Sequence, residues 1–251
     1  MKERLLAFAT GETDAIPIEI LQKYLCSQIS DTDPFFFIHI AALHERLPAI
    51  PQHLLTDAVL TFQASDGWTA VHYAANAQNL VQIPNPTENL FSVQTEDSRT
   101  PLHIIAENGI YDKNGLFTRY PPDCPIFESA LLIRDEFGKT PLHTAIEAAM
   151  EEGVNLDYAM PLACYTPKTL LATDYKFSEE ELRYEVDTSK GISPLELIIK
   201  NFPEFAENFL TIELPERAKK IVGEDWWARH IEIIVAKALT TESEATDMDL
   251  F

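Results

Sequence analysis

The chain has 251 residues, of which 46% are hydrophobic and 24% are charged, values typical of a folded protein and not of a disordered or fibrous one. Forty acidic residues against nineteen basic ones give a formal net charge of -21. This charge argues against binding to nucleic acid or an anionic membrane, because phosphate groups are bound by clustered Lys and Arg. It favours a basic protein partner, or simply serves solubility.

In chain order, the first expected element is a pair of helices over residues 1–32 that caps the N-terminal end of the fold. The two helices are expected near 2–10 and 17–26. Five related blocks follow over residues 33–220, and they begin near Asp33, Asp66, Asp97, Phe137 and Lys190. Insertions are expected near 110–123 and 174–187.

The C-terminal part of the chain is expected to close the fold. Residues 221–239, which include two tryptophans, have the pattern of an amphipathic helix that seals the last apolar face. Residues 240–251 form a short acidic tail.

The five blocks share a ten-residue pattern. The aligned stretches are 33–42, 66–75, 97–106, 137–146 and 190–199, at successive offsets of 33, 31, 40 and 53 residues. The third offset, of 40 residues, relates two identical Thr-Pro-Leu-His tetrapeptides, which begin at Thr100 and Thr140.

In this pattern the sequence resembles the ankyrin repeat family, whose signature is Thr-Pro-Leu-His-x-Ala on a period near 33 residues. The resemblance implies an all-α fold, an α-solenoid of stacked helix-turn-helix repeats with short hairpin turns, in which each repeat contacts only its neighbours. It covers nearly the whole chain.

The shared residues have physical roles at the start of a helix. A hydroxyl side chain can cap the free N–H groups that open a helix, and proline is tolerated at the first helical position. The capping positions are Thr69, Thr100, Thr140 and Ser193. Small pairs such as Ala41–Ala42 are expected to let the next repeat approach closely.

Four histidines occupy the signature position, namely His39, His72, His103 and His143. Side chains one repeat apart lie too far from each other to share a zinc ion, whose nitrogen ligands lie at about 2.0–2.1 Å. The repeat signature instead implies that each imidazole ties its own helix start to the neighbouring hairpin. No metal site and no cofactor are expected.

A second periodic signal consists of an apolar residue followed by proline. It occurs at Ile16-Pro17, Ile50-Pro51, Ile83-Pro84, Cys124-Pro125 and Met160-Pro161, and each proline is expected to begin the second helix of a repeat. The Ile-Pro-x-x-Leu-Leu form resembles a subtype found in bacterial ankyrin arrays and favours a bacterial origin.

Nothing in the sequence indicates catalysis or export. The three cysteines, Cys26, Cys124 and Cys164, form no C-x-x-C, zinc or nucleophile motif, which predicts reduced thiols in a reducing compartment. The apolar run at residues 5–9 is shorter than the roughly 7–15 residues of a secretory signal, and no uncharged stretch approaches the ~18 residues of a membrane helix. We therefore expect a soluble cytoplasmic protein that is not an enzyme.

The resemblance implies protein–protein binding through the concave surface formed by the hairpin tips and the exposed ends of the first helices. Carried over position by position, the expected partner-binding residues are Phe35, His44, Asp66, Trp68, Asn76, Asp97, Arg99, Glu107, Asn108, Phe137, Lys139 and Glu147. Lys190 and Lys200 are the corresponding positions beyond the 174–187 insertion, which breaks the regular surface. Trp and Arg are the types most enriched among interface hot spots.

Three kinds of function remain open for a monomeric binding protein of this composition. The first is a scaffold for an unspecified protein partner, and the second is an acidic inhibitor or immunity-type protein that covers a basic toxin or a nucleic-acid-binding protein. The third is a bacterial effector that acts in the host cell cytosol, since the Glu- and Ser-rich tail resembles some type IV secretion signals. Residues 16–25 also resemble the opening of an F-box, although the repeat register explains the same residues.

Overall fold

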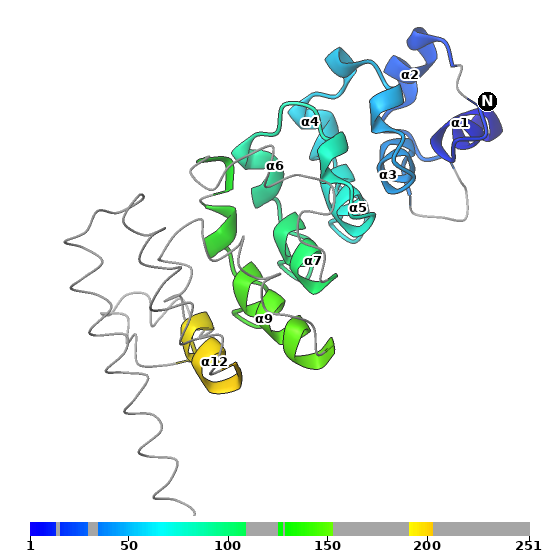
Figure 1. Cartoon of the computed structure of the whole chain (residues 1–251). Coiled ribbons are helices and arrows are strands. Elements are labelled where there is room, and N and C mark those ends of the chain that lie inside the picture. The colour runs from blue at the N-terminus through cyan, green and yellow to red at the C-terminus, as the bar shows by residue number, and fades with distance from the viewer. Residues whose placement is uncertain (14–15, 30–34, 109–124, 128, 153–190, 203–251) are drawn as a thin grey trace, which may run out of the picture.

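The computed structural model describes residues 1–13, 16–29, 35–108, 125–127, 129–152 and 191–202 (Figure 1). Within these ranges the regular structure is helical, with nine α-helices and no β-strand. Gln28 and Phe36 form an isolated antiparallel β-bridge. None of the helices in this part of the chain has the length and apolar character needed to cross a membrane.

One row of helices runs through the molecule in chain order. It consists of α1 (Lys2–Ala9), α3 (Phe37–Leu43), α5 (Ala70–Asn76), α7 (Pro101–Glu107), α9 (Pro141–Glu152) and α12 (Pro194–Asn201). Each helix packs on the next, from α1 against α3 to α9 against α12, as the blue-to-yellow progression in Figure 1 shows. The blocks aligned in the sequence thus become successive neighbours in space.

A second row, made mostly of shorter helices, runs alongside the first (Figure 1). It contains α2 (Ile18–Tyr24), α4 (Asp57–Leu60) and α6 (Glu88–Ser92), together with the 3-10 helices η1 (Leu47–Ala49), η2 (Gln52–Leu54), η3 (Leu80–Gln82), η4 (Pro125–Phe127) and η5 (Ala130–Leu132). In this row α4 packs against α6, and α6 against η4 and η5.

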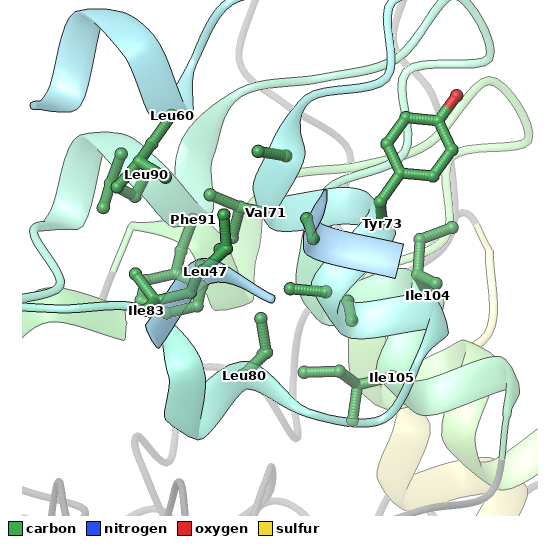
Figure 2. Close-up of a cluster of buried hydrophobic side chains, with 14 of the residues drawn as sticks. Leu47, Leu60, Val71, Tyr73, Leu80, Ile83, Leu90, Phe91, Ile104 and Ile105 are labelled. Carbon is green, nitrogen blue, oxygen red and sulfur yellow. The ribbon is translucent and has the colours of Figure 1, made fainter. Parts of the chain in front are cut away.

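The core lies between the two rows. Figure 2 shows Leu47, Leu80 and Ile83 from the short helical turns packed with Val71 and Ile105 from the first row. The alanines at the helix contacts, Ala41, Ala42, Ala74 and Ala75, are almost completely buried. Because each helix is short, burial against its neighbours and not intrinsic helix propensity stabilises it.

The predicted helix starts of the first row are confirmed. Helices α5, α7 and α12 follow Thr69, Thr100 and Ser193 directly, and α7, α9 and α12 begin with proline. The capping pair is also helical, since α1 and α2 occupy most of the predicted segments.

The prediction that each Ile-Pro proline begins a second helix is wrong at two positions. Pro51 precedes only the three-residue η2, and the α-helix begins six residues later at Asp57, after Thr56. Pro84 begins no helix, because the following Asn85 has a φ of 43° and stands before Pro86, and a residue before proline disfavours the helical region. The helix begins at Glu88, after Thr87.

Several predicted elements lie outside the described residues. These are the insertions at 110–123 and 174–187, the helix start at Pro161, the closing helix at 221–239 and the tail at 240–251. They remain predictions.

Candidate functional site

The side chains that open the helices of the first row are held by a repeated hydrogen-bond pattern. In α5 the backbone N–H of Thr69 donates to His72 Nδ1 over 3.2 Å, and the Thr69 hydroxyl lies 2.9 Å from the same nitrogen. Because Nδ1 is the acceptor, the ring proton sits on Nε2, which donates to the carbonyl oxygen of Arg99 over 3.1 Å. One imidazole therefore caps its own helix and holds the next turn.

The same pattern recurs in the following units. His103 accepts from the N–H of Thr100 and donates to the carbonyl oxygen of Lys139 over 3.0 Å, and His143 accepts from Thr140 and donates to Ile192 over 2.9 Å. We call these links, with that of His39 to Phe62 at 2.8 Å, the histidine bridges. For His72, His103 and His143 they confirm the prediction that the imidazole ties its own helix start to the neighbouring hairpin.

The first bridge is incomplete. The residue three positions before His39 is Phe36, which has no hydroxyl, and His39 Nδ1 is buried without a hydrogen-bond partner. Aromatic contacts take the place of the missing cap, because the Phe36 ring lies 5.6 Å from the imidazole and 4.8 Å from Phe62.

Burial favours the neutral form of three of the bridging imidazoles, those of His39, His72 and His103. Desolvation lowers the pKa of His72 and of His103 to about 4, although the backbone hydrogen bond of each ring opposes the shift. The pKa of His39 is lowered for the same reason. Within the described ranges, no three His, Cys, Asp or Glu side chains gather in a way that could hold a metal ion.

The hairpin turns of successive units also bond directly to each other. The N–H of Glu96 donates to the carbonyl oxygen of Asp66, and the N–H of Glu136 donates to that of Asp97, both over 3.1 Å. Gly67, with a φ of 78°, lies so close to the next turn that a Cβ there would be 2.7 Å from the Glu96 nitrogen. The turns therefore form a continuous, closely packed edge.

Three long polar side chains that sequence reasoning missed support this edge. Gln63 donates to the carbonyl oxygens of Gly67 (3.1 Å) and Gln94 (3.0 Å), and Gln94 donates in turn to those of Ser98 (2.7 Å) and Arg134 (3.0 Å). The Arg134 guanidinium donates to the carbonyl oxygen of Gly138 over 2.9 Å. Gln63, Gln94 and Arg134 are spaced 31 and 40 residues apart, like the blocks themselves. That spacing was the signal that could have identified them.

The twelve predicted binding residues lie on this edge and on the ends of the first-row helices. Six are exposed and six are half-buried; the exposed ones are His44, Asp66, Asn76, Asp97, Glu107 and Phe137. The Phe137 side chain is 69% exposed at the tip of its turn, which is unusual for a large apolar residue. All twelve therefore keep some contact with solvent.

Four of these residues form two ion pairs of the same register. Arg99 Nη2 lies 2.6 Å from Glu107 Oε2, and Lys139 Nζ lies 2.6 Å from Glu147 Oε2. In both pairs the cation stands on a hairpin turn and the carboxylate eight residues later on the following helix. We call them the edge ion pairs.

At the preceding unit the equivalent positions carry no charge. Trp68 stands where Arg99 and Lys139 stand, and Asn76 stands where the glutamates stand. The Trp68 ring is half-buried, with its centroid 5.1 Å from that of Tyr73 and 5.8 Å from that of His72. Trp68 thus contributes to packing as well as to the surface.

Comparison with known proteins adds no assignment. No protein-family model matches the chain, and no curated protein matches it significantly.

Proposed function

We propose that the chain is an α-solenoid of ankyrin-type repeats that binds another protein without catalysis. The observation that carries this proposal is the edge of hydrogen-bonded hairpin turns, which presents exposed side chains from one repeated unit after another. A rigid, repeated surface of this kind suits recognition, because little conformational freedom is lost when a partner binds.

The proposed partner-binding surface comprises the hairpin turns, the C-terminal ends of α5 and α7, and the middle of α9 at Glu147. Phe137 offers an apolar contact at one turn. The edge ion pairs hold two cations, Arg99 and Lys139, at equivalent positions of successive turns. Aromatic and arginine side chains of this kind dominate binding energies in protein interfaces. We expect the protein to act as a monomer in the cytoplasm.

A second candidate, an acidic protein that covers a basic one, is favoured by the charges of the turns. Asp66, Glu96, Asp97 and Glu136 are all exposed, and none has an ion-pair partner in the described part of the chain. An inhibitor of a toxin or of a nucleic-acid-binding protein, and an effector that binds a host protein, would both use this surface.

Site-specific photo-crosslinking in cells of the source organism tests the proposal. A photoreactive amino acid at Asn76 or at Glu107 should give a crosslinked protein partner, since both side chains are exposed at helix ends. The same amino acid at Glu19, exposed on α2 in the other row, is the matched control. Crosslinks from Glu19 alone would place the interface elsewhere and overturn the proposal.

A further inference from the structure

Large apolar side chains are exposed on two successive turns near the C-terminal end of the described edge. The Phe137 side chain is 69% exposed, and Ile192 on the next turn is 46% exposed. The two turns are neighbours, because His143, in the first turn of α9, donates to the carbonyl oxygen of Ile192 over 2.9 Å. At the position of Phe137, the two preceding turns carry exposed carboxylates, Asp66 and Asp97. The side chain at the tip of the turn thus changes from a carboxylate to an aromatic ring.

The backbone of the turn that carries Phe137 is held by several hydrogen bonds. The buried Asp135 carboxylate accepts the N–H of Phe137 over 2.9 Å and that of Lys139 over 2.8 Å. The N–H of Asp135 donates to the carbonyl oxygen of Lys139, and the Arg134 guanidinium donates to that of Gly138, both over 2.9 Å. A partner that contacts the Phe137 ring therefore orders little additional backbone, which lowers the entropic cost of binding.

Carboxylates lie beside the base of this side chain. Glu136 precedes Phe137 and is exposed, and its N–H donates over 3.1 Å to the carbonyl oxygen of Asp97, which is exposed on the preceding turn. The nearby cation is Lys139, whose Nζ lies 6.0 Å from the centre of the Phe137 ring and 2.6 Å from Glu147 Oε2. The surface is therefore apolar at the tip of the turn and acidic beside it.

The acidic surplus holds for the whole chain. Even if each of the 19 basic residues neutralised one of the 40 acidic residues, a charge of -21 would remain. A protein surface that meets exposed carboxylates of this chain is therefore expected to be basic. The same charge disfavours an anionic bilayer as the place where the Phe137 ring is buried.

We propose that Phe137 is an anchor residue that inserts into an apolar pocket of the protein partner, and that Lys or Arg side chains border this pocket. An aromatic ring contributes a large apolar area when it is buried, and anchor residues of interfaces typically fill well-packed pockets. Glu136 and Asp97 then face the basic border of the pocket and fix the orientation of the partner. This inference rests on the proposed function and names the chemistry of the partner's surface.

A synthetic host of the same chemistry tests whether the surface accepts such a pocket. The probe is a β-cyclodextrin with an ammonium group on each glucose unit, which offers an apolar cavity with a basic rim, and the derivative with carboxylates at the same positions is the reference. The protein is labelled with para-fluorophenylalanine, and the Phe137 resonance is assigned by its loss in Phe137→Leu. The ammonium host should shift this resonance and bind at least about tenfold more tightly than the carboxylate host.

Matched variants separate Phe137 from other apolar and acidic side chains, with the affinity for the ammonium host measured by titration calorimetry. Phe137→Ala should weaken binding at least about tenfold, because the cavity loses its guest. Met150→Ala removes an exposed apolar side chain of α9 and should change the affinity less than about twofold. Glu136→Gln should weaken binding about threefold, whereas Glu19→Gln on α2 should change it less than about twofold.

An unmoved Phe137 resonance when the ammonium host binds, or equal losses of affinity in Phe137→Ala and Met150→Ala, would overturn the inference. Binding to phosphatidylserine vesicles that is lost in Phe137→Ala would overturn it as well, because the ring would then insert into a bilayer. Crosslinking from Asn76 and Glu107 tests the proposed function independently. If the crosslinks form while Phe137→Ala binds the captured partner as tightly as the unchanged protein does, only the anchor is wrong.

Discussion

The histidine bridges and the edge ion pairs are both side-chain links that recur from one unit to the next, but they lie in different surroundings. The bridging imidazoles are buried, and His72 and His103 are completely enclosed. The edge ion pairs are partly solvated, and the Glu107 side chain is 55% exposed. Regular spacing alone therefore does not distinguish a structural residue from a binding residue. We expect the buried links to stabilise the packing of successive units, whereas the solvated ion pairs can open to bind a partner.

The largest expected effect is the removal of one complete bridge. His103→Ala leaves the carbonyl oxygen of Lys139 and the N–H of Thr100 without their partner and creates a cavity, so it should lower the free energy of unfolding by about 2–4 kcal/mol. Urea unfolding followed by circular dichroism measures this change. A loss as small as that of Arg99→Gln would contradict the distinction between buried and solvated links.

The second prediction is a loss of stability in mild acid. Because folding lowers the pKa of His72 and His103 to about 4 from an ordinary value of 6.5, the unfolded chain binds more protons between these values. The stabilising contribution is therefore complete above pH 6.5 and disappears as the pH falls toward 4.

Lowering the pH from about 7 to about 5 should destabilise the fold by roughly 2 kcal/mol for each of these two histidines. Thermal unfolding at the two pH values measures the effect. His103→Gln is the control, because it should remove the contribution of one histidine from the change in unfolding free energy between the two pH values. An unchanged pH dependence in this variant would show that other groups cause the acid sensitivity.

The third prediction compares a complete bridge with the incomplete one. Thr100→Val removes the hydroxyl beside His103 and should cost about 1 kcal/mol, as other lost helix caps do. At the incomplete bridge, Phe36→Thr should be more stable than Phe36→Ala by up to about 1 kcal/mol, because only the threonine offers a hydroxyl to the unpartnered His39 Nδ1. Equal unfolding midpoints for the two Phe36 variants would show that the hydroxyl does not reach the ring.

The smallest expected effect on stability is at the edge ion pairs. Lys139→Gln breaks the pair with Glu147, and solvent screening should limit the cost to less than about 0.5 kcal/mol. The variant should instead change binding to a partner captured by crosslinking, with an effect that decreases as the salt concentration rises. A large loss of stability without any change in binding would assign the pair to the fold rather than to the surface.

The sequence predicted the first-row helices well because their signals are local. A threonine or serine followed by proline caps and begins a helix wherever it occurs, and α7 and α12 start at these residues. The second row was predicted less well, because Pro51 and Pro84 follow isoleucine rather than a capping hydroxyl residue, and neither begins an α-helix. There the helices begin at Asp57 and Glu88, after Thr56 and Thr87, and the intervening residues form short turns that bring Leu54 and Ile83 into the core.

The candidate surface was also predicted only in part. The resemblance to the ankyrin signature implied a common surface for the twelve expected residues, and it implied that the histidines would hold neighbouring turns. It did not reveal that Arg99 and Lys139 are neutralised by their own glutamates, or that Tyr73 packs between Phe35 and Trp68. These contacts join residues that are five to 38 positions apart and depend on how the turns are placed.

The sequence by itself therefore determined the helical class, the order of the units and the residues that open four of the first-row helices, α5, α7, α9 and α12, because capping and hydrophobic spacing act within a few residues. The tertiary structure alone decided which polar groups became buried and which stayed in water. Close packing of the turns encloses His103 while it leaves Glu107 exposed, although the two stand four residues apart on one helix. Desolvation depends on all neighbours in space, and that is why it separates the residues that hold the fold from those available for binding.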